Sequence, residues 1–136
     1  MKTILLAALF LVPGLLAAEP HRPPGKDTPE MVAQLKQDAA ALEQQVKAAP
    51  SADLYLKLGF TYARLRQADD ALRAFEATVS LDPAKADAYY MLGLIYEKKG
   101  MNDKALGAWN ACLAHTSEDH MRKTAMRHIH HLTANK

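Results

Sequence analysis

The chain has 136 residues, 49% of them hydrophobic, and a formal net charge of +2 from 17 Lys and Arg against 15 Asp and Glu. This length is that of one domain, and so balanced a charge argues against nucleic acid or an anionic membrane as a partner. Cys112 is the only cysteine, so the chain forms no internal disulfide and packing has to hold the fold.

The beginning of the chain, 1–18, has the pattern of a secretory signal peptide. Lys2 supplies a positive start, residues 4–12 form an unbroken apolar run, and Ala17-Ala18 offer small residues to a signal peptidase. A membrane span would need about 20 apolar residues, more than this segment contains. We therefore expect an exported protein, periplasmic or secreted, with no membrane span after the signal peptide (1–18) is removed. Its net charge would fall to +1 because Lys2 is lost.

Residues 19–29, "EPHRPPGKDTP", are predicted to form a flexible linker because they contain four prolines and a glycine. At its end Thr28 can cap a helix and Pro29 suits the first helical position. Apolar residues then recur at helical spacing to about Ala48. A helix is therefore predicted over 30–48, and Pro50 ends it.

Helical patterns fill the rest of the chain, and no segment alternates apolar and polar residues as a strand would. Pro83 separates two helix pairs, Gly100 suits the end of a helix, and Ser117 can cap the last one. The predicted fold class is all-α. The expected helices run roughly over 52–66, 69–81, 86–99, 102–115 and 118–133.

Two neighbouring stretches of this helical region have similar sequences. The stretch "LGFTYARLRQADDALRAF" at 58–75 returns as "LGLIYEKKGMNDKALGAW" at 92–109. Aligning 52–85 with 86–119 shows eleven identical pairs. A fixed period of this length is typical of arrays in which neighbouring helix pairs bury each other's apolar faces.

The repeat resembles the tetratricopeptide repeat, whose signature has an aromatic residue, then Leu-Gly and Tyr, then Ala and a large aromatic, then Pro. The second copy departs from it only at the end, where Ser117 replaces the proline. The first copy supplies Tyr55, Leu58, Gly59, Tyr62, Ala71, Phe75 and Pro83, and the second supplies Tyr89, Leu92, Gly93, Tyr96, Ala105 and Trp109.

This resemblance implies a short solenoid of antiparallel helix pairs with a flanking helix at each end. The domain would span 30–136, with repeats at 52–85 and 86–119. Because "ALEQQVKAAP" at 41–50 mirrors "AFEATVSLDP" at 74–83, residues 30–49 resemble the second half of a degenerate repeat. The 118–133 helix would cap the other end. Gly59 and Gly93 are expected at close helix crossings, and Cys112 is expected to be buried.

The resemblance also implies a concave groove, lined by the first helix of each repeat, that binds a peptide or helix of another protein. Phe60 and Tyr90 are the expected anchors, because aromatic side chains dominate such contacts. Asp53, Ala63 and Asp87 occupy neighbouring positions. The predicted groove residues are Leu56, Lys57, Phe60 and Arg64 from the first repeat and Tyr90, Met91, Leu94, Glu97 and Lys98 from the second.

The chemistry of the remaining residues favours a binding protein over an enzyme. No nucleophile with a base and no Gly-rich phosphate loop can be identified, so we expect neither a catalytic site nor a cofactor. Five of the six histidines lie from His115 onward, and His128 and His131 are i, i+3 neighbours that could share a metal. Metal sites usually add a Cys or carboxylate at defined spacing, and none is present here. A histidine-based metal-binding protein is therefore kept only as the alternative hypothesis.

The favoured function is therefore an exported adaptor or scaffold that holds another protein in an apolar groove. Two further arrangements would bury the same face: cover by the 30–48 helix, or a homodimer that makes the protein a self-associating structural element.

Export gives a direct prediction. Mature protein isolated from its native host should begin at Glu19 or one residue to either side, and intact-mass measurement outside the cytoplasm checks this. A full-length soluble species inside the cytoplasm would contradict it.

Overall fold

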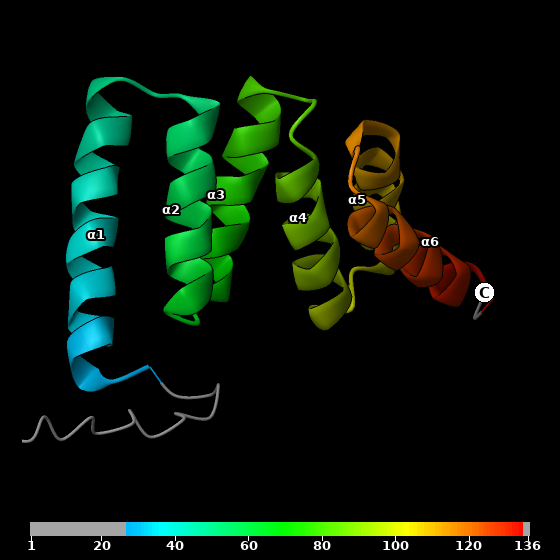
Figure 1. Cartoon of the computed structure of the whole chain (residues 1–136), viewed down its shortest axis with the longest axis horizontal. Helices are drawn as coiled ribbons and strands as arrows, with labels where there is room; N and C mark the ends of the chain where they lie inside the picture. The colour runs from blue at the N-terminus through cyan, green and yellow to red at the C-terminus, as the bar shows by residue number, and fades with distance from the viewer. Residues whose placement is uncertain (1–26, 135–136) are drawn as a thin grey trace, which may run out of the picture.

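The computed structural model describes residues 27–134, which form six helices and no strand. Consecutive helices run in opposite directions, and they follow one another along the long axis of the molecule from α1 to α6, as Figure 1 shows. This confirms the predicted all-α solenoid with flanking helices. The predicted signal peptide and residues 19–26 of the linker lie outside the described residues. The helices are α1 (Pro29–Ala48), α2 (Ala52–Arg64), α3 (Ala68–Leu81), α4 (Ala86–Lys98), α5 (Asn102–His115) and α6 (Asp119–Ala134).

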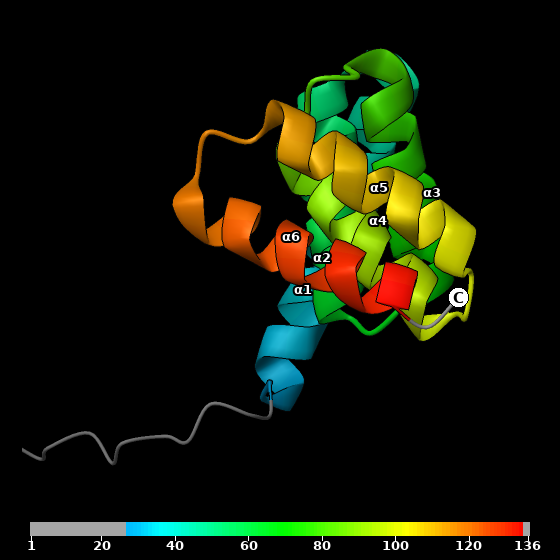
Figure 2. The ribbon, with the colours of Figure 1, turned by 90° about the vertical axis from the view of Figure 1, so that its right-hand side faces the viewer.

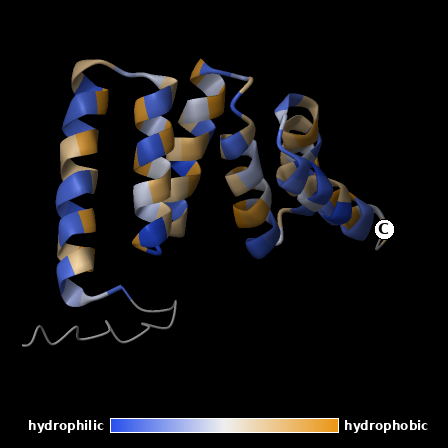
Figure 3. Cartoon of the chain, viewed as in Figure 1, coloured by the Kyte–Doolittle hydropathy of each residue, from blue (hydrophilic) through white to orange (hydrophobic). Residues whose placement is uncertain are grey.

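Short polar residues start the first two helices. The Thr28 hydroxyl accepts a hydrogen bond from the Met31 amide at 3.3 Å, and the Ser51 hydroxyl accepts one from the Leu54 amide at 3.2 Å. Each bond satisfies an amide that has no partner within the helix. Along α1, hydrophobic and hydrophilic residues alternate at helical spacing (Figure 3), and the stripe containing Leu35 and Val46 is buried.

The turn inside each helix pair has a left-handed residue at the same repeat position. Gly100 has φ 71° after α4, and its counterpart in the first repeat, Arg66, has φ 60° after α2. Matching hydrogen bonds close the two turns, from the Met101 amide to the Tyr96 carbonyl and from the Gln67 amide to the Tyr62 carbonyl, both at 2.9 Å. Glycine adopts this conformation without strain, whereas arginine does so at a cost.

Each helix pair is held by an aromatic ring that lies on a glycine. A Cβ atom added to Gly59 would lie 2.6 Å from Cε1 of Phe75, and one added to Gly93 would lie 2.5 Å from Cε2 of Trp109. The rings of Phe75 and Trp109 are fully buried. The close crossings predicted at both glycines are confirmed, and the rings are what needs the space.

A tyrosine–glutamate contact joins each pair to the helix before it. The Tyr96 hydroxyl donates to Glu76 Oε1 at 2.6 Å, and the Tyr62 hydroxyl donates to Glu43 in the same way. Burial, with help from Glu43, raises the pKa of Tyr62 to about 12. Because Glu43 stands on α1 where Glu76 stands on α3, α1 contacts α2 as α3 contacts α4.

The C-terminal helix α6 lies against α5, and the two are side by side at the end facing the viewer in Figure 2. Met121, Ala125 and Leu132 form its buried stripe. They join the same core as Trp109 and Cys112. Within residues 27–134, no helix is both long enough and apolar enough to cross a membrane.

The close contact between a ring and a glycine predicts that two Gly→Ala substitutions differ in their effect on stability. Gly93→Ala should lower the free energy of unfolding by about 1–3 kcal/mol, because the Trp109 ring has to move out of its site. Gly107→Ala is the control, since an added Cβ there meets nothing within 4 Å. It should be neutral or stabilising by up to about 1 kcal/mol. Urea unfolding followed by circular dichroism measures both, and equal stability of the two variants would contradict this account.

Candidate partner-binding site

The first helices of the two repeats lie on one side of the row, and the second helices lie on the other. Figures 1 and 2 show α2 and α4 on the side opposite α3 and α5, with α1 and α6 at the two ends. We call the side formed by α2 and α4 the groove face, and define it by the predicted residues found there: Leu56, Lys57, Phe60, Arg64, Tyr90, Met91, Leu94 and Lys98.

A hollow of about 470 Å³ lies between α1 and α2. It brings together three predicted residues, Lys57, Phe60 and Arg64, with residues of α1 that the sequence did not single out. Those residues are Leu35, Asp38, Ala41, Leu42 and Gln45. We call this space the α1–α2 hollow.

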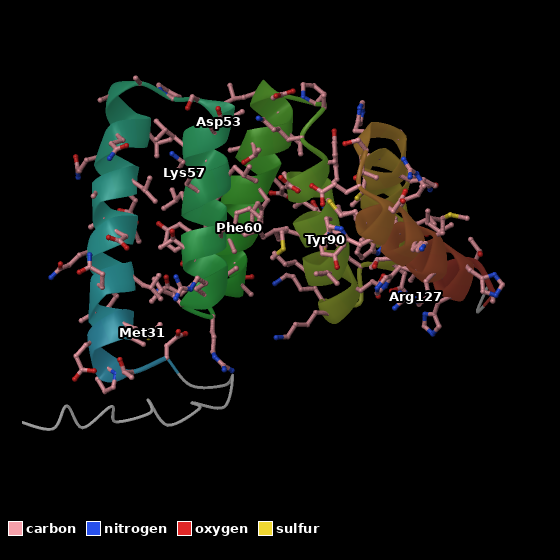
Figure 4. The ribbon with its side chains drawn as sticks, in the orientation of Figure 1. Met31, Asp53, Lys57, Phe60, Tyr90 and Arg127 are labelled. Carbon is pink, nitrogen blue, oxygen red and sulfur yellow. The ribbon has the colours of Figure 1, made fainter. Side chains whose placement is uncertain are left out.

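A second hollow, of about 210 Å³, lies on the other side of Phe60. It brings Phe60 together with Tyr90 and Met91 of α4, and with the beginning of α6. The segment before α6 and its first turn supply Glu118, His120 and Met121, which sequence reasoning also missed. Phe60 is thus the residue that the two hollows share. Figure 4 shows its position on α2, between α1 and Tyr90 of α4.

The two expected anchors differ in how much of the ring is available. Phe60 lies edge-on to Phe75 with ring centroids 5.3 Å apart, and Tyr90 lies edge-on to Trp109 at the same distance. Phe60 is 39% exposed, whereas Tyr90 is half-buried against the core. Phe60 is therefore the stronger candidate anchor, because a side chain that already packs against the core has less surface to offer a partner.

The apolar neighbours of these rings also differ in how much of each side chain is exposed. Leu56 and Met91 pack partly against the core, whereas Leu94 is 36% exposed. Because Phe60 and Leu94 remain exposed, α1 does not cover the groove face. It forms a wall beside α2.

Glu97 does not belong to the groove face, although the sequence placed it there. Its Oε1 accepts a hydrogen bond from Trp109 Nε1 at 2.6 Å and lies 2.8 Å from His128 Nδ1. The imidazole of His128 stacks on the indole of Trp109 with centroids 4.4 Å apart. Only 23% of the Glu97 side chain and 25% of the His128 side chain are exposed. Glu97 therefore joins α4 to α5 and α6.

The charges of the groove face and the acidic groups near it differ in how fully they are paired. Asp53 accepts a hydrogen bond from Lys85 Nζ at 2.8 Å, and this contact lowers the pKa of Asp53. Arg64 has only Asp27, at 3.5 Å. Within residues 27–134, Lys57 and Lys98 take part in no ion pair.

Two stretches match family models of the tetratricopeptide repeat, residues 52–85 and residues 74–107. Over residues 52–107 the chain is therefore similar to tetratricopeptide repeats. A comparison with curated proteins found no match. Tetratricopeptide repeats generally mediate protein–protein interaction, which makes the groove face, on the first helices of the two repeats, the candidate site.

Two histidines, His115 and His128, and the cysteine contribute to the packing of the repeats. His128 contacts Glu97 and Trp109, and His115 stacks on Tyr89 with centroids 6.1 Å apart. Residues 27–134 contain no group of three or more His, Cys, Asp or Glu side chains placed to hold a metal ion. Cys112 is fully buried as predicted, and burial raises the pKa of its thiol to about 11.

The position of Glu97 inside the repeats gives a test by substitution. Glu97→Ala should lower the free energy of unfolding by about 1–3 kcal/mol, because it leaves the Trp109 and His128 ring nitrogens without their acceptor. Lys98→Ala, on the exposed surface of the same helix, should change it by no more than about 0.5 kcal/mol. Thermal unfolding measures both, and an undisturbed Glu97→Ala variant would return this residue to the groove face.

Proposed function

We propose that this protein is an exported, non-catalytic adaptor that binds a peptide or helix of another protein on its groove face. The observation that carries the proposal is the exposed ring of Phe60 between two hollows. Large apolar side chains left exposed beside concave surfaces are typical of interaction sites. Leu94 extends the apolar surface along α4.

The groove face has the composition of a reversible interface. Apolar residues lie at its centre, and Lys57, Arg64, Asp87 and Lys98 lie around them as exposed charges. Charges at such a rim set orientation and association rate more than affinity. The half-buried Tyr90 and Met91 support the centre from beneath and keep its shape.

Export is the second part of the proposal and is supported by the sequence alone, through Lys2, the apolar run 4–12 and Ala17-Ala18. An adaptor outside the cytoplasm has to remain folded without a disulfide, since Cys112 has no second cysteine to pair with. The aromatic–glycine contacts of the two repeats supply that packing.

The test is site-specific photocrosslinking in the native host. A photoreactive amino acid at Phe60 should give a discrete adduct with another protein, identifiable by mass spectrometry. The same amino acid at Asn110, which is exposed on α5, is the control and should give none. An adduct only with a second copy of the chain would show self-association instead. Equal labelling from both positions, or from neither, would reject the groove face as the binding site.

A further inference from the structure

The α1–α2 hollow has the geometry of a missing helix. In α3, the stripe Ala71, Ala74, Phe75 and Thr78 is buried. The preceding helix α2 covers this stripe, since Phe75 lies on Gly59 and Ala74 packs with Leu58. A buried stripe of this kind needs a neighbouring helix on it.

Within residues 27–134 no helix lies over the same stripe of α1, although Leu42 packs partly against the cluster that includes Leu58 of α2. By the alignment that pairs Glu43 with Glu76, the equivalent residues are Asp38, Ala41, Leu42 and Gln45. All four line the α1–α2 hollow, and three of them are exposed while Leu42 is half-buried. The other wall of the hollow is the side of α2 that bears Lys57, Phe60 and Arg64. The corresponding residues of α4 are Met91, Leu94 and Lys98.

No helix within residues 27–134 fills this place, and the sequence just before α1 is unfavourable for a helix. A first helix for α1 would correspond to residues 19–31, which include Pro20, Pro23, Pro24 and Gly25. Prolines inside a helix remove hydrogen bonds and clash with the preceding turn. In addition, α1 already begins at Pro29, well before Leu35, the residue equivalent to the start of α3 at Ala68.

We propose that the α1–α2 hollow is the seat of an amphipathic helix donated by another protein, which completes the half repeat of α1. This inference rests on the proposed function and makes it specific. The apolar side of the donated helix would lie on Leu35, Leu42 and Phe60. This is a form of helix-in-groove recognition, in which the groove consists of the two walls left by an absent helix.

Charge selects the kind of helix. The α2 wall presents Lys57, whose charge helps to lower the pKa of Asp53 one turn earlier but which forms no salt bridge within residues 27–134, and Arg64, which lies 3.5 Å from Asp27. The α1 wall presents Asp38, which already accepts a hydrogen bond from Gln34 Nε2 at 2.8 Å. A helix with acidic side chains toward α2 therefore complements the hollow. The polar Asp38 and Gln45 keep α1 soluble while the seat is empty, as at the end of a repeat array.

The probe for this seat is the helix that fills the equivalent place in the next repeat. A synthetic peptide of residues 51–66 contains all of α2, and Ala63 and Arg66 lie beside Lys98, the counterpart of Arg64. An acidic peptide carries Ala63→Glu and Arg66→Glu, and a basic peptide carries Ala63→Lys. Titrated into the chain from residue 19 to 136, the acidic peptide should shift amide NMR signals at Leu35, Leu42 and Phe60, and bind at least about tenfold more tightly than the basic one.

Two neighbouring positions on α1 provide the matched variants. Ala41 is exposed and lines the hollow, whereas Ala40 is exposed but does not line it. Ala41→Arg should weaken binding of the acidic peptide at least about tenfold by filling the seat, and Ala40→Arg should leave it unchanged. Arg64→Glu should reverse the preference between the two peptides. Circular dichroism checks that all three variants are folded.

Several results would overturn the proposal. They are equal effects of Ala41→Arg and Ala40→Arg, amide shifts confined to α4, or binding that appears only after residues 19–26 are deleted, which would make that segment the occupant. A dimer that Ala41→Arg dissociates would make the occupant a second copy. If crosslinking from Phe60 captures a partner while these tests fail, the adaptor function stands and only the helix seat falls.

Discussion

The contact on which the rest of the structure depends is an aromatic ring lying on a glycine. Phe75 on Gly59 and Trp109 on Gly93 set how closely the two helices of each pair approach. Both rings are fully buried, and they pack edge-to-face with Phe60 and Tyr90. The indole of Trp109 also positions Glu97 and His128, so that α6 docks on the same ring that closes the second repeat. The same two buried rings therefore form the core and hold the aromatic side chains of the groove face in place.

The ends of the array differ because their last helices are of different kinds. At the C-terminal end α6 lies on α5 with a buried apolar stripe and adds the edge of a hollow beside Phe60. At the N-terminal end α1 has the position of a second helix, and residues 27–134 contain no first helix before it. Its inner stripe packs on α2 through Ala39 and Val46, and its outer stripe is left open. A solenoid whose end lacks half a repeat presents a concave surface there, because the neighbouring pairs set the spacing that the missing helix would fill.

The sequence predicted which residues could form the groove face but not how each one is used. The repeat period placed Lys57, Phe60 and Arg64 on one helix face, and the structure brings them together around one hollow. Glu97 has an equally suitable spacing on α4, yet it turns toward Trp109 and His128. Its contact with His128 joins distant parts of the chain and depends on where α6 crosses α5, which no local pattern specifies. The residues of α1 and of the segment before α6 that line the hollows were not predicted for the same reason, since they approach the site only through tertiary contacts.

By itself, the sequence determined the helices, their ends to within two residues and their order in the array. These features follow from local chemistry, such as Thr28 and Ser51 as caps, Pro50 and Pro83 as breaks, and the glycine and aromatic positions that recur from one repeat to the next. The tertiary structure decided which apolar side chains stay exposed. Phe60 and Tyr90 hold equivalent aromatic contacts, but only Phe60 is left open, between two hollows. Exposure depends on every neighbour of a side chain at once, and those neighbours come from helices far apart in the chain.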